Sequence, residues 1–591
     1  MAAGLDRGGV GKYLCMNAAE HIALSLERRG VTHVFELVGG MITFLLDAMH
    51  RRTGIRVVSM HHEQGAGFAA EGWARVKGIP AVAMATSGPG ATNLLTAIGS
   101  CYFDSTPAVF ITGQVNRHEQ KGDRAIRQLG FQETDIVAMA RPVVKAAWMV
   151  TDATELPAML DEAFRLAASG RPGPVLIDIP MDVQRAEVAD PEDHAATFPV
   201  GGGTGSAAAA RDWWQSFLAV LSASRHPLIL SGGGIRSARA AQEFREVVDR
   251  LGIPVVHSLM GVDNLPADHP LRVGLIGSYG NRWANTALAE SDLLLVLGSR
   301  LDIRQTGADT DAFREGRTIF HVDCEEGEMN NRVTRCRTFC SDLRPFLESV
   351  LTMPWGRKDC AAWITEIRSL EARWPDTAEL AGMEGINPNE FMRELSAGSS
   401  AAAGYLADVG QHQMWAAQSL RLGPHQRFLT SGGMGAMGFA LPAGIGACLG
   451  ASGQPVVVIA GDGGFQLNIQ ELQNVARLGL PVKMVVLNNS CHGMVRQFQE
   501  SYFHGRYQST VWGYSAPDFS RVAGAYGIAA LRVSEPTDVA GGIRAMWEHP
   551  AQPFLLEVMV PMQANAYPKM AFGRPMSEME PLAKPIEMEG T

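Results

Sequence analysis

One acidic and one amide side chain stand where two apolar segments of the sequence end. Asp462 lies in the glycine turn that follows "PVVVIA", and Asn489 follows "VKMVVLN" twenty-seven residues later. Both segments predict buried strands, and the carboxyl ends of parallel strands meet at one edge of a sheet. A carboxylate, an amide oxygen and phosphate oxygens suit octahedral Mg²⁺. Gly-Asp-Gly alone is typical of a tight turn, so the predicted metal and phosphate site depends on the preceding strand and on Asn489.

The unit that carries this pair occurs twice in the chain. Residues 83–115 and 458–490 each predict a strand, a glycine turn, a helix, a short loop and a second strand. Such units place the glycine turn at the carboxyl edge of a parallel sheet, where open α/β folds bind ligands. We therefore expect a duplicated module with a different domain between its two copies.

Apolar runs of four to seven residues alternate with helix-like segments along most of the chain. Continuous apolar runs are typical of parallel sheets that are covered on both faces. The predicted fold class is α/β, with three doubly wound parallel-sheet domains. Linkers are predicted at 186–211, which is rich in Gly, Ala and Pro, and at 353–388, which lacks strand-like runs. The predicted units are residues 14–188, 210–352 and 386–565, with a tail at 566–591.

Composition favours small-molecule partners. The 591 residues carry a formal net charge of -10 without long runs of one sign, which argues against a nucleic-acid surface. The eight cysteines are scattered without zinc spacing, as expected for reduced thiols in a cytoplasmic protein. The sequence has neither the pattern of a signal peptide nor an uninterrupted apolar stretch of the roughly 20 residues that a membrane helix needs. We expect no partnership with membranes.

Several longer motifs carry a family resemblance. They are "HEQGAGFAAEGWAR" (62–75), "TSGPGATNLLTAI" (86–98), "FQETDIV" (131–137), "GQHQMWAAQ" (410–418), "TSGGMGAMGFALPA" (430–443) and "GDGGFQLNIQELQNVARLGLPVKMVVLNN" (461–489). Together they make residues 16–560 similar to thiamine-diphosphate-dependent enzymes of the acetohydroxyacid synthase (acetolactate synthase) branch. The resemblance implies a pyrimidine-binding first domain, a central domain, and a third domain that binds diphosphate and Mg²⁺. It also implies self-association into a dimer or tetramer, because active sites of this family lie between subunits.

The resemblance assigns a chemical role to Glu63. This acid would meet N1' of the aminopyrimidine ring, so that the 4'-nitrogen can take the proton from C2 of the thiazolium. Without the resemblance, Glu63 would be interpreted as a surface or capping acid at a helix start. The neighbouring His62 is interpreted as a packing or hydrogen-bonding residue. The implied metal ligands are Asp462, Asn489 and the carbonyl group of Cys491.

The other implied contacts to the cofactor belong to glycine turns and helix starts of the first and third domains. They are Gly39, Thr86, Asn93, Gly410, Gln411, His412, Gly435, Met437, Gly461, Gly463, Gly464, His492, Gly493 and Met494. Met437 would hold the cofactor in its bent form.

The central domain carries a strand followed by three glycines, "LILSGGG". Three glycines are a weak signal, because a helix-packing turn explains them equally well. The resemblance favours a bound FAD, with ADP or no ligand as alternatives. The candidate contacts are Gly232, Gly233, Arg300 and Asp323.

Departures from the family pattern concern the substrate. The usual Pro-Gly-Gly-Ala is replaced by Val38-Gly39-Gly40-Met41, the acid expected beside Arg304 by Ile303, and the expected pocket tryptophan by Phe498. The tail from 566 can be interpreted equally as a solvated end or as a segment that folds over the active-site mouth. The predicted substrate contacts are Met41, Gln114, Phe131, Gln132, Ile303, Arg304 and Phe498.

These features predict a carboligase or lyase. It would decarboxylate pyruvate or a related 2-oxo acid and transfer the acyl unit to a carbonyl acceptor. One alternative is a hydrolase that uses the same cofactor to cleave a C-C bond of a 1,2-diketone. A second alternative is a non-catalytic binding or regulatory homologue.

Overall fold

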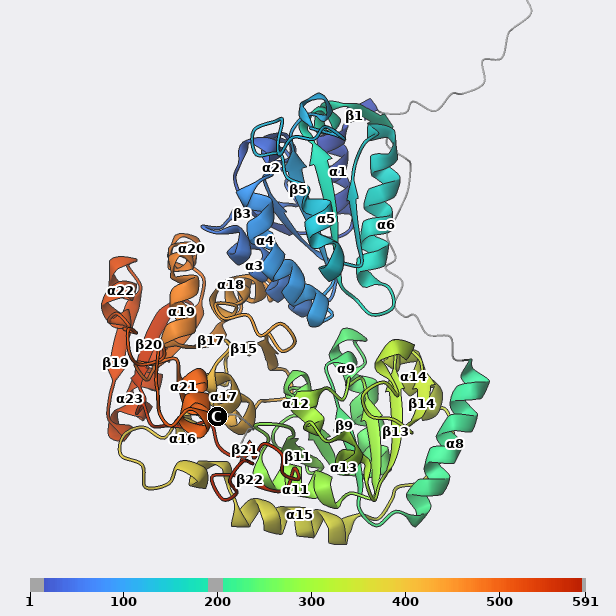
Figure 1. Cartoon of the computed structure of the whole chain (residues 1–591), viewed down its shortest axis with the longest axis vertical. Coiled ribbons are helices and arrows are strands. Elements are labelled where there is room, and N and C mark those ends of the chain that lie inside the picture. Colours follow the sequence, from blue (N-terminus) through green and yellow to red (C-terminus); the bar gives the residue numbers. More distant parts are fainter. Residues whose placement is uncertain (1–14, 190–205, 587–591) are drawn as a thin grey trace, which may run out of the picture.

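The computed structural model describes residues 15–189 and 206–586. Residue 14 of the predicted first domain, most of the first predicted linker (190–205) and the end of the predicted tail (587–591) lie outside the described residues. Within the described ranges, no helix is both long and apolar enough to cross a membrane. The seven cysteines whose side chains are described are free thiols. The body of the molecule has three α/β parts (Figure 1).

The first and third sheets follow the same path. Each has six parallel strands, and numbering the strands of each sheet in chain order gives the spatial order 2-1-3-4-6-5 in both. The first sheet runs β3 (Arg56–Ser59), β2 (His33–Leu37), β4 (Ala81–Ala85), β5 (Ala108–Gln114), β7 (Pro174–Pro180) and β6 (Ala146–Met149). The third runs β16 (Arg427–Thr430), β15 (Gly404–Ala407), β17 (Val456–Gly461), β18 (Val482–Asn488), β20 (Phe554–Met559) and β19 (Ala529–Val533). The identical path confirms the predicted duplication.

The middle sheet has a different order. It runs β11 (Arg272–Leu275), β10 (Val255–His257), β9 (Pro227–Ser231), β12 (Leu293–Leu297), β13 (Thr318–Asp323) and β14 (Arg337–Cys340). In chain order this is 3-2-1-4-5-6, the order of dinucleotide-binding folds, which bind their ligands where the order reverses. In this sheet the reversal lies between β9 and β12.

Helices cover both faces of each sheet, because the buried strands are apolar on both sides. Around the first sheet lie α1 (Ala18–Arg28), α2 (Thr43–His50), α3 (Glu63–Lys77), α4 (Pro89–Phe103) and α6 (Leu156–Ala168). Around the middle sheet lie α8 (Ala207–Ala223), α10 (Ala241–Leu251), α11 (Arg282–Glu290) and α14 (Leu343–Leu351). Around the third sheet lie α16 (Pro388–Gly398), α17 (Gln411–Ser419), α18 (Ala440–Gly450), α20 (Leu472–Leu478), α22 (Phe519–Ala525) and α23 (Val539–Trp547).

The first and third domains share one hydrophobic core through α3 and α18. Phe68 and Phe439 meet edge to face with ring centroids 5.5 Å apart. The helices cross so closely that a Cβ on Gly72 would lie 2.1 Å from the carbonyl oxygen of Ala443. A Cβ on Gly446 would lie 1.8 Å from the carbonyl oxygen of Ala69. Glycine at both crossings is therefore what lets the two domains pack as one body.

The second predicted linker carries more structure than its sequence indicates. Within 353–388 the chain forms α15 (Ala361–Arg373), whose buried Trp363 and Ile367 join the core of the middle domain. The expectation of a plain linker is therefore wrong here. The sequence lacks strand-like runs because its apolar residues follow helical spacing.

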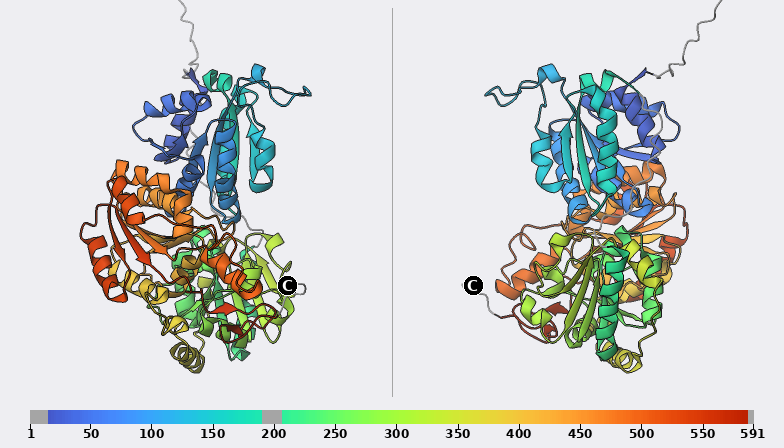
Figure 2. Two further views of the ribbon diagram at one scale, coloured as in Figure 1. Left: turned by 60° about the vertical axis from the view of Figure 1, so that its left-hand side comes forward. Right: turned by 90° about the vertical axis from the view of Figure 1, so that its right-hand side faces the viewer.

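The described part of the tail is packed. Strands β21 (Lys569–Met570) and β22 (Met579–Glu580) pair antiparallel, and the amide of Met570 donates to the carbonyl of Ser278 (2.8 Å). Buried Arg282 donates to the carbonyls of Met579 and Glu580 (both 3.2 Å). The dark-red tail accordingly lies against the green middle domain (Figures 1 and 2). Of the two interpretations, the solvated tail does not hold for these residues.

Candidate active site

The third domain gathers its candidate residues at the carboxyl edge of its sheet. The strand order reverses between β15 and β17, and α17 begins at Gln411 directly after β15. Helix α19 (Asp462–Leu467) follows β17, and α21 (Gly493–Tyr502) follows β18. Helix starts present free N–H groups and a positive dipole end, which favour a bound phosphate. The topology therefore brings three segments to one anion-binding edge.

Three oxygen atoms converge beside these helix starts. The side-chain oxygen of Asn489 lies 2.8 Å from the carbonyl oxygen of Cys491 and 3.2 Å from Oδ1 of Asp462. Exchanging the amide oxygen and nitrogen of Asn489 would turn these contacts into hydrogen bonds. In the present orientation, however, Asn489 Nδ2 donates to Gln411 Oε1 (3.2 Å). Oxygens that face one another suit a hard cation such as Mg²⁺, which prefers oxygen ligands.

The environment of Asp462 fits a metal ligand. Burial raises the pKa of its carboxyl group to about 6, against a hydrogen bond from Tyr514 that lowers it. The Tyr514 hydroxyl donates to Asp462 Oδ2 (2.9 Å), which leaves Oδ1 facing Asn489. A cation beside this buried carboxylate would favour its ionised form. Among the described residues no group of three His, Cys, Asp or Glu side chains could hold a metal, so a site here depends on amide and carbonyl oxygens.

A phosphate would also find a donor at His412. Its Nε2 is buried and has no hydrogen-bond partner among the residues that the structure describes, and burial lowers the pKa of the ring to about 3. A Cβ on Gly461 would lie 2.9 Å from Nδ1 of this ring, and a Cβ on Gly463 would lie 2.7 Å from the ring of His492. The two glycines therefore leave room beside the rings of His412 and His492. The neutral His412 ring can donate a hydrogen bond from Nε2 to a ligand, and these residues fit a diphosphate.

The other predicted cofactor contacts of the third domain lie in the turns that follow its strands. A Cβ on Gly493 would lie 2.0 Å from Oε1 of Gln411, whereas Gly435 has a φ of +67° and open space on its Cβ side. His492 packs against Tyr514 with ring centroids 4.4 Å apart. The rest follow β15, β16, β17 and β18: Gly410, Met437, Gly464 and Met494.

The predicted acid, Glu63, lies in the first domain. Glu63 is the first residue of α3, and His62 is the N-cap, whose Nδ1 accepts the amide of Gln64 (3.0 Å). The carboxylate of Glu63 is buried and accepts a hydrogen bond from Asn93 Nδ2 (3.0 Å). A Cβ on Gly90 would lie 3.2 Å from Glu63 Oε1, so the start of α4 leaves room for this carboxylate. His62 thus has the hydrogen-bonding role expected of it, and Asn93 is placed to orient Glu63.

The turn after β2 is held tightly. A Cβ on Gly39 would lie 2.4 Å from Cβ of Thr86, and Thr86 Oγ1 accepts the amide of Met41 (3.3 Å). The carbonyl of Met41 accepts a bond from Nε2 of buried Gln184 (2.8 Å). In the first sheet β2 and β4 flank the reversal of strand order, so this turn is the counterpart of the anion-binding edge in the third domain.

Gln114, one of the predicted substrate contacts, is buried in the first domain. Its Nε2 donates to the carbonyl of Thr134 and to Asp178 Oδ2 (both 2.9 Å), while Oε1 accepts the amide of Val115 (3.0 Å). Because Gln114 is 1% exposed, it can act on substrate only by holding the segment before Thr134. That segment presents Phe131, which is 79% exposed, and Gln132, whose φ is +65°.

The predicted substrate residues of the other two domains are linked through the tail. Ile303 is 62% exposed at the start of α12 (Ile303–Thr306), and the carbonyl of Arg304 accepts the amide of Ser278 (2.6 Å). Ser278 also bonds to the tail. Phe498 packs against Tyr502 at 4.7 Å, and Tyr502 lies under Lys569 of the tail (5.3 Å). The tail therefore ties the Arg304 segment to α21.

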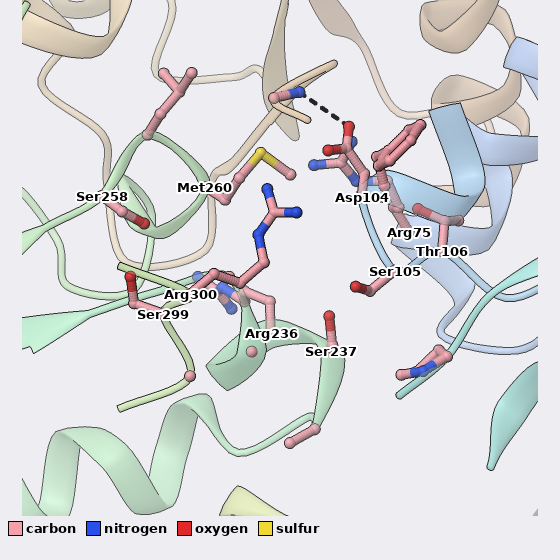
Figure 3. Close-up of a pocket in the computed structure, with 18 of the residues that line it drawn as sticks. Arg75, Asp104, Ser105, Thr106, Arg236, Ser237, Ser258, Met260, Ser299 and Arg300 are labelled. Carbon is pink, nitrogen blue, oxygen red and sulfur yellow. Dashed lines mark hydrogen bonds between the residues drawn. The ribbon is translucent and has the colours of Figure 1, made fainter. Parts of the chain in front are cut away.

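A pocket lies between the three domains, where the middle sheet reverses its strand order. Figure 3 shows Arg75, Asp104 and Thr106 of the first domain facing Arg236 and Arg300 of the middle domain. The third domain closes the pocket, and Asp104 accepts the amides of Gly432 (2.9 Å) and Gly433 (2.6 Å).

Three of the four predicted nucleotide contacts line this pocket: Gly233, Arg300 and Asp323. Gly232 is not among its lining residues; a Cβ there would lie 2.0 Å from the carbonyl oxygen of Gly298. Gly232 thus allows the turns after β9 and β12 to touch. Burial raises the pKa of Asp323.

Comparison with known proteins agrees with this geometry. The N-terminal TPP binding domain of the thiamine pyrophosphate enzymes matches residues 16–139, their central domain matches residues 214–350, and their C-terminal TPP binding domain matches residues 408–558. The acetolactate synthase large subunit of Lactococcus lactis is 36% identical over 95% of this chain and 96% of its own length. The chain belongs to the thiamine pyrophosphate enzyme family, in its acetolactate synthase-like branch.

Other members of this family are similarly close. The acetolactate synthase large subunit of Corynebacterium glutamicum is 38% identical over 96% of this chain and 90% of its own length. Chloroplastic acetolactate synthase 2 of Nicotiana tabacum is 38% identical over 93% of this chain and 83% of its own length. The similarity therefore covers all three sheets.

Sequence reasoning missed several residues of this thiamine pyrophosphate enzyme. Tyr514 bonds to Asp462, Asp178 holds Gln114, and Gln184 holds the turn at Met41. All three act on residues distant in sequence, and Tyr514 lies in a stretch without a recognisable pattern. The only available signal was a polar residue inside the apolar run "PVLIDIP", at Asp178.

Proposed function

We propose that this protein is a thiamine-diphosphate and Mg²⁺ dependent carboligase. It decarboxylates pyruvate or a related 2-oxo acid and transfers the acyl unit to a carbonyl acceptor, as the names of its acetolactate synthase relatives suggest. The observation that carries the proposal is the convergence of the Asp462, Asn489 and Cys491 oxygens, together with His412, whose Nε2 has no hydrogen-bond partner in the described part of the chain. Thiamine diphosphate, when bound, supplies a carbon nucleophile and an electron sink for the loss of CO₂.

The protein's own residues bind the metal ion and the diphosphate, orient the substrate, and hold a proton. Asp462, Asn489 and the Cys491 carbonyl hold Mg²⁺, while His412 and the starts of α17 and α21 bind the diphosphate. Glu63 holds the proton at N1' of the aminopyrimidine, and Asn93 fixes the orientation of its carboxyl group. The exposed side chains of Phe131, Ile303 and Phe498 form the substrate side of the site, and Arg304 binds the substrate carboxylate.

The test of this function measures CO₂ release and products. Purified protein with thiamine diphosphate and Mg²⁺ is incubated with a panel of 2-oxo acids and a mixed pool of aldehydes and ketones, followed by mass spectrometry. Release of CO₂ with a new C-C bond is expected. Cleavage of a cyclic 1,2-diketone in place of 2-oxo acids would establish the hydrolase alternative. Inactivity of both wild type and Glu63→Gln on every substrate would favour the non-catalytic alternative.

We also propose FAD, or ADP, as the ligand of the pocket between the three domains. The dinucleotide-type order of the middle sheet and the position of Gly233, Arg300 and Asp323 support it. Visible absorption of the purified protein and chromatography of the nucleotides released by heat distinguish FAD from ADP. Arg300→Ala is expected to lower the bound nucleotide at least tenfold.

Self-association of two or four copies is part of the same proposal. Large apolar side chains are exposed on segments next to the candidate site: Phe131 (79%), Leu467 (53%), Val495 (53%) and Trp512 (53%). Figure 2 shows the loop between β5 and α5 (Ile136–Ala140), which carries Phe131, projecting from the first domain. Exposed apolar side chains beside a site are the kind of surface that a second copy of the chain would bury. Analytical ultracentrifugation measures the assembly, and a monomer with full activity would contradict it.

A further inference from the structure

Glu471 of the third domain reaches across to the start of α3, where Glu63 lies. It ends the short helix η8 (Ile469–Glu471), and its side chain is fully buried. Oε1 accepts the amide of His61 at 3.0 Å, and Oε2 accepts Nδ2 of Asn474 at 2.6 Å. The amide of His62 adds a second backbone donor to this carboxylate. A side chain more than four hundred residues away thus caps the turn that leads into α3.

The fit around Glu471 is close on both sides. A Cβ on Gly65, in the first turn of α3, would lie 2.7 Å from Glu471 Oε1, so a larger residue there would push the carboxylate out of its present position. A negative group at a helix start is stabilised by the helix dipole and by the free amides. The neighbouring Asn468 forms a second hydrogen bond between the third domain and the start of α3, since its Nδ2 donates to Oε1 of Gln64 (3.3 Å).

The carboxylate is surrounded by groups that favour its acceptor role. Burial raises its pKa to about 6, while Asn474, the two histidine amides and Arg477 lower it. His61 Nδ1 lies 3.9 Å from Oε2. The Glu471 oxygens are therefore committed to the His61–His62 turn and to Asn474.

We propose that Glu471 is a positioning residue for Glu63: it fixes the His61–His62 turn, and thereby the place of the Glu63 carboxylate, from the opposite domain. This inference depends on the proposed function, in which Glu63 holds the proton at N1'. Asn93 holds the Glu63 side chain, whereas Glu471 holds the backbone that carries it. Loss of Glu471 therefore affects proton transfer and leaves the diphosphate and metal contacts in place.

The first test measures backbone amides in the protein without added cofactor. Hydrogen exchange followed by mass spectrometry is compared for peptides that cover residues 58–66 in the wild type, Glu471→Gln and Glu471→Ala. Exchange at this turn is expected to rise at least tenfold in Glu471→Ala. Glu471→Gln keeps an acceptor oxygen for the His61 amide, so its exchange rate is expected to lie between those of the wild type and Glu471→Ala. Unchanged exchange in Glu471→Ala would overturn the inference.

The second test separates positioning from general domain contact. Ser100→Ala is the matched control, because the Ser100 hydroxyl lies 3.4 Å from the Ser431 hydroxyl across the same two domains and takes no part in the hydrogen bonds of Glu471 given above. Glu471→Ala is expected to lower kcat for CO₂ release from pyruvate tenfold to a hundredfold, with KM and cofactor affinity within twofold, whereas Ser100→Ala retains kcat. Equal losses in both variants, or a loss explained by the unfolded fraction seen in circular dichroism, would overturn it.

Failure of the proposed function has a different signature. If the wild type releases no CO₂ from any 2-oxo acid, the proposed role of Glu63 is contradicted. The hydrogen exchange result still tests whether Glu471 holds the His61–His62 turn. An active wild type together with an unimpaired Glu471→Ala leaves the proposed function standing and rejects the positioning role alone.

Discussion

Asp178 on β7 and Gln114 on β5 form a hydrogen bond of 2.9 Å inside the first sheet. Asp178 also accepts the hydroxyl of Thr112 (2.7 Å), and the carboxyl group is completely buried. Burial raises its pKa to about 7, against the two hydrogen bonds that lower it. Through Gln114 and the carbonyl of Thr134, this buried acid supports the segment that presents Phe131.

Asp178→Asn is expected to stabilise the protein at high pH. In the unfolded chain the carboxyl group ionises near pH 4, whereas in the folded protein it stays neutral up to about pH 7. Its contribution to stability is therefore present at low pH and is lost as pH rises between these values. The neutral Asn avoids this loss, so the free energy of unfolding rises by about 2 to 4 kcal/mol above pH 7. Urea unfolding at pH 5 and pH 8 measures the difference, and a gain no larger at pH 8 than at pH 5 would contradict it.

Gly72→Ala is expected to weaken the contact between the first and third domains. The added methyl group would lie 2.1 Å from the Ala443 carbonyl oxygen, and separating α3 from α18 costs about 3 kcal/mol. Gly524→Ala in α22 is the matched control, because a Cβ there meets nothing within 4 Å, and it is expected to stabilise by about 0.5 to 1 kcal/mol. Thermal unfolding separates the two, and equal shifts in Tm would refute the close crossing.

Asp462→Asn is expected to weaken Mg²⁺-dependent binding of thiamine diphosphate by about a hundredfold or more, because it removes the only carboxylate of the oxygen cluster. Tyr514→Phe keeps the carboxylate but loses its 2.9 Å partner, and an effect of about tenfold is expected. Isothermal titration of the cofactor at fixed Mg²⁺ measures both. If Asp462→Asn bound as the wild type does, the metal assignment would be wrong.

Phe498→Trp is expected to change the choice of acceptor. The Phe498 ring is 43% exposed and rests on Tyr502 at 4.7 Å, so a larger indole extends into the open side of the site. Exclusion of bulky acceptors by about tenfold relative to small ones is expected. Leu531→Trp on the edge strand β19 adds a ring outside the site and serves as control. Product ratios from paired acceptors test this, and identical ratios in all three proteins would exclude Phe498 from the pocket.

Much of the fold was predictable because the strands are continuous apolar runs with glycine turns after them. The repeated pattern at 83–115 and 458–490 predicted the duplication, which the shared strand order confirms. Helix α15 was not predicted, because its segment has no strand-like run and the helical spacing of Trp363 and Ile367 gains meaning only when both side chains pack on the middle domain. Gln114 was expected beside substrate, yet its amide groups are all used within the protein.

The sequence by itself determined the cofactor class through the family resemblance of its longer motifs, such as "GDGGFQLNIQELQNVARLGLPVKMVVLNN". The positions of Asp462 and Asn489 after two strands predicted, in addition, that both lie at one sheet edge. The sequence also determined which residues lie in the turns and helix starts at that edge, because turns and helix starts depend on residues that are close in sequence. Only the tertiary structure decided which distant groups support them. Glu471 meets the His61 amide, and Gln184 meets Met41, because separate domains or strands pack together. Such contacts arise from packing between elements far apart in the chain, which local patterns do not encode.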